Sequence, residues 1–229
     1  MKEVKKLYKD WSQNYDTDSK SNIAIITGEK MILPILKPKN KDKVLDIGCG
    51  TGRVTKLISK KTKKVIGIDF SNEMIQIAKK TLKNAKNIEY KKVDISKKLP
   101  FKDNSFDKVT AILVLNHIKY NKRLFKEIYR ILKKDGIFIF DDFVTKLKKP
   151  FRPRKKSLLV KKTSTSEKAN LIFGKGIKDY INDLHETNFE IEEIKFTKID
   201  KTTEKYLTKQ SYLKNKGRTL EAFYKCKKQ

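Results

Sequence analysis

Residues 44–52 read Val-Leu-Asp-Ile-Gly-Cys-Gly-Thr-Gly, a short apolar run that leads directly into three closely spaced glycines. The apolar run is typical of a strand buried on both faces of a parallel sheet. Glycines allow a sharp turn and let a ligand approach the backbone, because they carry no Cβ atom. The stretch therefore predicts a strand, a turn and a helix, with a ligand bound beyond the carboxyl end of the strand.

Strands and helices are expected to alternate along the chain from this stretch onward. Apolar runs predict five strands, at 43–47, 64–70, 88–95, 106–115 and 137–143. Helical spacing predicts helices over 54–59, after Ser71 as the N-cap, and over 124–132 with Gly136 as its end. This alternation indicates an α/β fold, a mainly parallel sheet with helices on both faces.

The remaining segments extend this core. Residues 189–199 and 219–226 alternate like strands, with no clear helix between them, so we expect an antiparallel carboxyl-terminal pair at the sheet edge. The expected organisation is an N-terminal helical cap (1–40), the core (41–145), a basic insertion or lid (146–170), and a carboxyl-terminal helix with the edge strands (171–229) that completes the same domain.

Composition narrows the class of protein. The chain has 229 residues, of which 38% are hydrophobic and 36% charged, as expected for one globular domain with a highly charged surface. No apolar run approaches the roughly 18 residues of a membrane span, and the first ten residues hold no apolar signal core, so we expect a cytoplasmic protein. Cys49 and Cys226 are too few for a disulfide framework or a cysteine-rich zinc site, and we expect no metal.

The chain is strongly basic, with a net charge of +29. A basic protein can attract nucleic acid through phosphate contacts, particularly through the segment Lys146 to Lys168, where ten residues are basic and one is acidic. The alternative is a general lysine bias, because lysines occur in nearly every segment and only six of the 56 basic residues are arginines.

Asp69 stands at the end of the second predicted strand, about 20 residues after the glycines, where an acid can bind both hydroxyls of a ribose. Dinucleotide enzymes use the same acid, but their fingerprint is G-x-G-x-x-G/A. Counting from Gly48 or Gly50, the last glycine of that fingerprint would stand at Arg53 or Thr55. The pattern here is G-x-G-x-G preceded by an aspartate, which favours a different nucleoside ligand.

These residues resemble the first motif of class I S-adenosylmethionine-dependent methyltransferases, in the group that includes the ubiquinone and menaquinone methylases. The likeness extends from about Tyr8 to Lys227, through the motifs at 93–95, 99–107 and 130–136. The resemblance implies a Rossmann-like sheet of seven strands, S-adenosylmethionine as the cofactor and methyl transfer as the activity. It does not indicate the acceptor or the oligomeric state.

The resemblance also implies roles for particular residues. Those expected at the cofactor's methionine portion are Asp46, Gly48, Gly50, Gly52, Ala111 and Ile112, with Tyr15 closing over the cofactor and Arg53 pairing with its carboxylate. Those expected at the nucleoside are Asp69 on the ribose, Phe70 and Ile95 against the adenine, and Asp94 on its amino group. Alternatives are open: Asp46 can hold the turn, Asp69 can cap a helix, Asp94 can be a loop acid, Tyr15 a core aromatic and Arg53 a surface residue.

His117 follows the fourth predicted strand, where relatives often place a histidine near the acceptor, and it is the candidate catalytic residue. A structural histidine is the alternative, and Asp141 and Asp142 are weaker candidates at the same rim. Asn116 and His117 stand where methylases of base amines carry an Asp/Asn-Pro-Pro-aromatic tetrapeptide, which argues against that class. Three hypotheses remain: a methyltransferase for a small molecule or lipid precursor, one for RNA that uses Lys146 to Lys168, and a non-catalytic relative.

Overall fold

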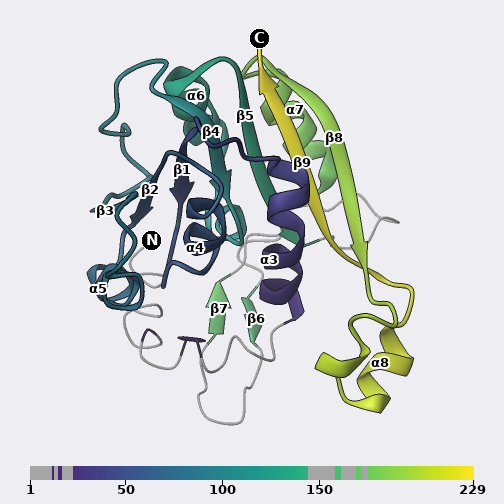
Figure 1. The fold of residues 1–229 in the computed structure, drawn as a ribbon. Helices are drawn as coiled ribbons and strands as arrows, with labels where there is room; N and C mark the ends of the chain where they lie inside the picture. Colours follow the sequence, from purple (N-terminus) through teal and green to yellow (C-terminus); the bar gives the residue numbers. More distant parts are fainter. Residues whose placement is uncertain (1–11, 13–14, 17–22, 144–157, 161–168, 172–174) are drawn as a thin grey trace.

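The protein is built around one seven-stranded sheet (Figure 1). The computed structural model describes residues 12, 15–16, 23–143, 158–160, 169–171 and 175–229. The sheet order is β3-β2-β1-β4-β5-β9-β8. Its strands are β1 (Lys43–Ile47), β2 (Lys64–Asp69), β3 (Ile88–Lys92), β4 (Phe106–Ala111), β5 (Leu132–Phe143), β8 (Phe189–Lys198) and β9 (Thr219–Lys228). Neighbours from β1 to β5 are parallel, whereas β9 is antiparallel to both β5 and β8, which confirms the expected fold class.

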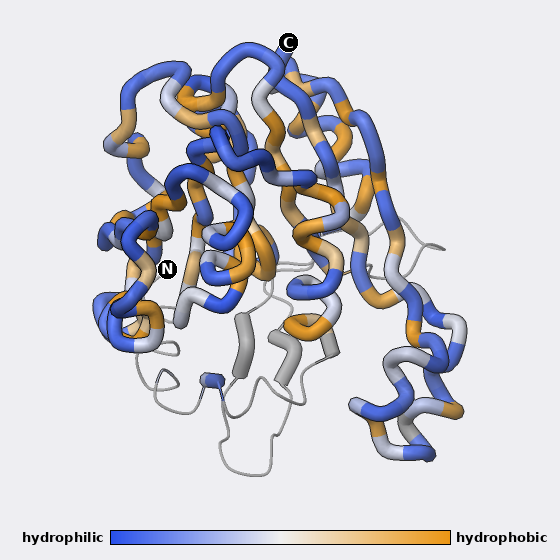
Figure 2. The backbone as a smooth tube through the Cα atoms, viewed as in Figure 1, coloured by the Kyte–Doolittle hydropathy of each residue, from blue (hydrophilic) through white to orange (hydrophobic). Residues whose placement is uncertain are grey.

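Helices cover both faces of the sheet (Figure 1). On one face α3 and α4 enclose apolar residues of β1, β2, β5 and β9, and on the other α6 and α7 cover the larger cluster. Apolar segments accordingly lie in the middle strands, whereas the outer loops are mainly polar (Figure 2). The helices are α3 (Ile23–Leu36), α4 (Arg53–Ser59), α5 (Asn72–Thr81), α6 (Lys122–Ile131), α7 (Ile177–His185) and α8 (Lys209–Asn215), with 3₁₀ turns η1 (Leu115–His117) and η2 (Glu204–Tyr206) and the short strands β6 (Leu158–Val160) and β7 (Ala169–Leu171).

Several local predictions are confirmed and others are wrong. Ser71 caps α5, since its hydroxyl accepts a hydrogen bond from the Met74 N–H at 3.2 Å. The expected end of α6 at Gly136 is wrong, because the helix ends at Ile131 and Leu132 already has extended dihedral angles. A short helix, α8, also lies between the last two strands, where none was expected. No helix within the described ranges is long and apolar enough to cross a membrane.

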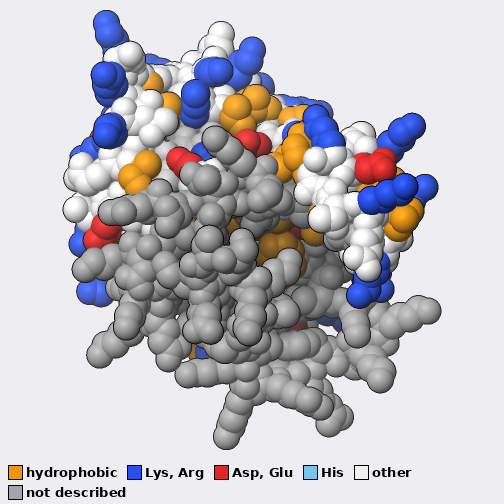
Figure 3. Space-filling view, turned by 90° about the horizontal axis from the view of Figure 1, so that it is seen from below, with side chains coloured by type: hydrophobic (Ala, Val, Ile, Leu, Met, Phe, Trp, Pro, Cys, Tyr) orange, Lys and Arg blue, Asp and Glu red, His pale blue; other side chains and the backbone are white. Residues whose placement is uncertain are grey.

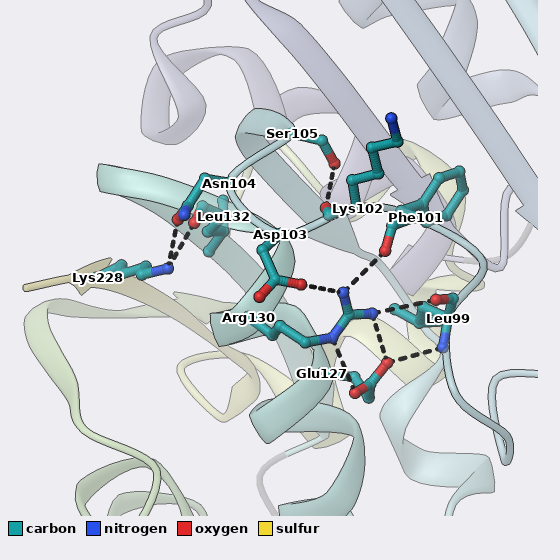
Figure 4. A network of polar contacts seen from close by, with 10 residues as sticks. All are labelled: Leu99, Phe101, Lys102, Asp103, Asn104, Ser105, Glu127, Arg130, Leu132 and Lys228. Carbon is teal, nitrogen blue, oxygen red and sulfur yellow. Dashed lines mark hydrogen bonds and ion pairs between the residues drawn. The ribbon is translucent and has the colours of Figure 1, made fainter.

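Arg130 near the end of α6 ties the loop after β3 to this helix (Figure 4). Its guanidinium donates to the carbonyl oxygens of Phe101 at 2.8 Å and Leu99 at 3.1 Å. Glu127, which pairs with Arg130 at 2.8 Å, also accepts from the Leu99 N–H at 2.8 Å. A planar guanidinium can satisfy these diverging acceptors together, whereas an ammonium group cannot. Arg130 and Glu127 therefore fix the loop that follows β3.

Replacing this fork tests its contribution to stability. Arg130→Lys keeps the charge but loses at least one bond to a loop carbonyl, so we expect the free energy of unfolding to fall by about 1–2 kcal/mol in a urea titration. Arg123→Lys on the same helix is the control, because Arg123 is exposed and its replacement should leave the midpoint unchanged. Equal midpoints for both variants would contradict the assigned role.

Candidate functional site

The glycine loop between β1 and α4 is built from left-handed turns. Gly48, Gly50 and Gly52 have φ angles of 66°, 52° and 87°, which side chains rarely adopt. A Cβ atom on Gly48 would lie 2.3 Å from Val114, and one on Gly52 would lie 2.7 Å from the Tyr90 hydroxyl. A Cβ on Gly50 would meet no atom within 4 Å. Two glycines therefore serve packing, and Gly50 borders open space that a ligand can enter.

Asp46 lies behind this loop at the end of β1. Its two carboxylate oxygens accept hydrogen bonds from Thr55 at 2.6 Å and Thr110 at 2.9 Å. Burial, with a smaller contribution from the charge of Asp69, raises the pKa of Asp46 to about 6. Because these threonines belong to α4 and β4, Asp46 joins the loop's helix to the centre of the sheet.

Asp69 at the end of β2 holds the loop from the other side. Its Oδ2 accepts from the Gly50 N–H at 3.0 Å and its Oδ1 from the Ser71 N–H at 2.8 Å. Burial raises its pKa, and these backbone hydrogen bonds oppose that shift. Each oxygen keeps a further lone pair, so the carboxylate can also accept from a ligand's hydroxyl.

A cavity opens above the loop at the carboxyl ends of the strands. Asp46 and Asp69 line it, and its volume is about 1050 Å³ counted out to the open mouth. The other lining residues, from the N-terminal segment, α3, the glycine loop, α4, α5 and the ends of β3 and β4, are Tyr15, Ile25, Glu29, Gly48, Cys49, Gly50, Thr51, Arg53, Val54, Phe70, Met74, Val93, Ile95, Ile112, Leu113, Val114, His117 and Ile118.

Three expected cofactor residues do not line the cavity, and Gly52 of the glycine loop is one of them. Ala111 is fully buried in the core of β4, and the wall begins one residue later, at Ile112. Asp94 also stands outside the lining, where its Oδ1 accepts from the Ser96 N–H at 3.0 Å and from the Ser96 hydroxyl at 2.6 Å. The loop-acid alternative describes its position in this structure, while the neighbouring Val93 and Ile95 form the wall.

Residues that come before β1 in the sequence make polar contacts with the glycine loop and the start of α4. Asp16 accepts from the Thr51 hydroxyl of the glycine loop at 2.7 Å. Tyr15 is next to it on the cavity, and burial raises its pKa to about 12. Arg53 pairs with Glu29 of α3. Sequence reasoning missed Glu29, because it lies on a helix outside every motif.

His117 lines the cavity beside the apolar residues that follow β4. Leu113 in this turn has a left-handed φ of 57°, and its N–H donates to Asp141 Oδ1 at 2.6 Å. Asp141 therefore fixes the turn that carries the wall between Ile112 and His117. Asp141 itself is fully buried and contributes to the site through this backbone contact.

Buried acids gather behind this wall. Asp142 accepts from the Tyr180 hydroxyl at 2.6 Å. Glu221 is fully buried, and within the described part of the chain neither of its carboxylate oxygens has a hydrogen-bond partner. Burial raises the pKa of Glu221 well above its usual range, and the charges of Asp141 and Asp142 raise it further. Among the described residues, no group of three or more His, Cys, Asp or Glu is arranged to hold a metal ion.

These acids should make stability depend on pH. A carboxyl group whose pKa is raised by folding holds a proton that the unfolded chain releases above about pH 4, so stability should fall as pH rises from there. Glu221→Gln removes one such group, and we expect this variant to gain on the wild type between pH 5 and pH 8 in urea titrations. Glu193→Gln on the exposed face of β8 is the control and should show the wild-type slope. An unchanged slope for Glu221→Gln would exclude this account.

Comparison with known proteins agrees with this geometry. Residues 45–140 match the family model described as a methyltransferase domain. Residues 45–140 form a class I, S-adenosylmethionine-dependent methyltransferase domain. The chain is 34% identical over 109 residues to a demethylmenaquinone methyltransferase of Thermotoga maritima, covering 47% of this chain and 46% of that protein.

Other relatives extend this comparison. An uncharacterized protein of Methanocaldococcus jannaschii, MJ1252, is 38% identical over 138 residues, which cover 60% of this chain and 50% of that protein. The chain thus spans about half the length of these curated relatives. The crystal structure of an S-adenosylmethionine-dependent methyltransferase from Mesorhizobium loti superposes with a TM-score of 0.67 at 17% identity, over 89% of this chain and 97% of that one, which shows the shared fold.

S-adenosylmethionine is the cofactor of this methyltransferase domain, and the cavity suits it. Gly50 leaves the space that a ligand against the loop needs, and Asp69 has lone pairs for ribose hydroxyls. Phe70, Val93 and Ile95 supply apolar surface for a purine ring.

Filling the space at Gly50 should therefore weaken cofactor binding. Gly50→Ala places a methyl group in the cavity and strains a left-handed turn, so we expect at least tenfold weaker S-adenosylmethionine binding by calorimetry and a loss of about 1 kcal/mol in stability. Gly217→Ala is a matched control, since Gly217 has a φ of 78° with open space around it and does not line the cavity. It should lose the same stability and keep the wild-type affinity. Equal affinities in the two variants would contradict the placement of the ligand.

Proposed function

We propose that this protein transfers the methyl group of S-adenosylmethionine to a small-molecule acceptor with an apolar portion, such as a lipid precursor. The observation that carries this proposal is the wall after β4. Ile112, Leu113, Val114 and Ile118 line the same cavity as the glycine loop, and His117 stands among them. Ligand sites with mainly apolar walls and few polar groups suit small, largely apolar molecules.

The cofactor supplies a methyl group that its sulfonium makes electrophilic, so the protein's main task is positioning. In this proposal the apolar wall holds the acceptor in line with the methyl group and excludes water. His117 orients the reacting atom and accepts its proton where the acceptor carries one. Asp141 acts indirectly, because it holds the Leu113 turn from which this wall extends.

The relatives support a small acceptor. The protein from Thermotoga maritima is named a demethylmenaquinone methyltransferase, and a demethylmenaquinone is a small molecule with an apolar chain. That likeness covers about half of each protein, so we propose only the chemical class of the acceptor.

The RNA alternative has less support. Most of the basic segment Lys146 to Lys168 lies outside the described residues. On the face drawn in Figure 3, the lysine and arginine side chains of the described residues are scattered and form no single patch. Among the described residues that line the cavity, Arg53 is the one arginine or lysine. A small-molecule acceptor therefore fits the cavity better than the sugar-phosphate backbone of RNA.

Methyl-labelled cofactor tests the proposal directly. The protein is incubated either with an RNA-free extract of small molecules and lipids or with total RNA, and we expect label in the extract at both low and high salt. Label that appears only in RNA and disappears as salt rises would contradict the proposal, because phosphate contacts weaken steeply with salt.

His117 can be tested in the same assay. His117→Ala should lower the rate of transfer by about 10²-fold or more when the acceptor proton must be removed, while cofactor affinity stays within about twofold. His185→Ala is the control, since His185 lies on the exposed side of α7. A full rate in His117→Ala would assign His117 a structural role.

A further inference from the structure

Two opposite charges face the cavity from neighbouring helices. Arg53 is the first residue of α4 and Glu29 lies on α3, and the two side chains form an ion pair. Their exposed fractions are 25% and 30%, so both remain within reach of a ligand. Both residues line the cavity together with Tyr15.

The Glu29–Arg53 pair leaves more hydrogen-bonding atoms available to a ligand than Asp46 and Asp69 do. Both carboxylate oxygens of Asp46 and of Asp69 already accept one hydrogen bond each from a hydroxyl or backbone donor, so each oxygen has a single lone pair left. In the described part of the chain, Arg53 and Glu29 meet only through Nε and Oε1. One carboxylate oxygen of Glu29 and both terminal nitrogens of Arg53 are thus left for other partners.

We propose that Glu29 binds the ammonium group at the methionine end of S-adenosylmethionine, beside Arg53, which the resemblance to methyltransferases already pairs with the cofactor's carboxylate. This inference rests on the cofactor in the proposed function and adds the residue that recognises its amino group. An α-amino acid carries one positive and one negative charge, and the Glu29–Arg53 pair presents the complementary charges. A guanidinium can bind a carboxylate through two parallel N–H groups, which its free terminal nitrogens supply.

The composition of the cavity supports recognition of a zwitterion. Arg53 is the one lysine or arginine among the described lining residues, although 56 of the 229 residues of the chain are basic. An adenosine nucleotide would bring two or more negative charges to a cavity that Asp46, Asp69 and Glu29 also line. An adenosyl amino acid adds no net charge at its amino acid end. The pair therefore selects the adenosyl amino acid over adenosine phosphates.

Four ligands separate the two charges, with binding measured by calorimetry in the absence of an acceptor. S-adenosylhomocysteine carries both groups, its decarboxylated analogue keeps only the amine, its deaminated analogue keeps only the carboxylate, and methylthioadenosine has neither. The wild type should bind S-adenosylhomocysteine at least tenfold more tightly than methylthioadenosine.

Glu29→Gln keeps the size of the side chain and removes its charge. We expect about tenfold weaker binding of S-adenosylhomocysteine and of the amine-only analogue, since a hydrogen bond between charged groups at a partly exposed site is lost. Binding of methylthioadenosine and of the carboxylate-only analogue should be unchanged or tighter. Glu89→Gln is the control, because Glu89 pairs with Lys64 and Lys91 on β3, away from the cavity lining, and should bind all four ligands like the wild type.

Three results would overturn the inference. Equal losses for all four ligands in Glu29→Gln would show that Glu29 only supports the fold of the cavity. A loss for the carboxylate-only analogue would show that Glu29 only positions Arg53. A wild type that binds methylthioadenosine as tightly as S-adenosylhomocysteine would exclude recognition of the amino acid end. Failure to bind any of the four would instead remove the cofactor assignment and, with it, the proposed function.

Discussion

The hydrogen bond from the Gly50 N–H to Asp69 Oδ2 is the constraint on which the site depends. It joins the turn after β1 to the end of β2, two neighbouring parallel strands, and so fixes the glycine loop to the sheet. Gly50 has a left-handed φ, and a Cβ atom at this position would extend into open space. The same bond thus sets the shape of the cavity floor and the position of Asp69, the acid expected to bind a ribose.

Much of the fold could be predicted because its signals are local. The apolar runs of β1, β2 and β4 and the N-cap at Ser71 each involve a few consecutive residues, and each lies where the pattern placed it. The prediction that α6 ends at Gly136 is wrong, because a glycine after an amphipathic stretch is not always the point where the helix stops. In the structure the chain is already extended at Leu132, which pairs with Phe106 of β4.

The site was harder to predict because it depends on contacts between distant segments. The motif placed Gly50, Asp69, Phe70 and Ile95 on the cavity, since their positions follow from strand ends. Ala111 was one residue away from the wall, because the strand's last inward residue depends on where β4 leaves the sheet. Glu29 was missed, since nothing in the sequence of α3 reveals which side of the helix meets α4.

The charge of the chain has two different distributions. Lysine and arginine side chains are scattered over the described part of the face in Figure 3, whereas the cavity combines three acids with one arginine among its described lining. Buried Asp141, Asp142 and Glu221 add further acidity behind the wall. The net charge therefore describes the exterior and gives the wrong sign for the environment in which a ligand is held.

The cavity also has a divided origin. The matched domain begins at Leu45, yet Tyr15, Ile25 and Glu29, which line the cavity, precede it in the sequence. The glycine loop and Asp69 lie within the matched range, whereas part of the cavity wall comes from residues that precede it. Such a division lets the two parts change independently in evolution. The matched domain can retain its cofactor while a different leading segment changes which acceptor enters the cavity.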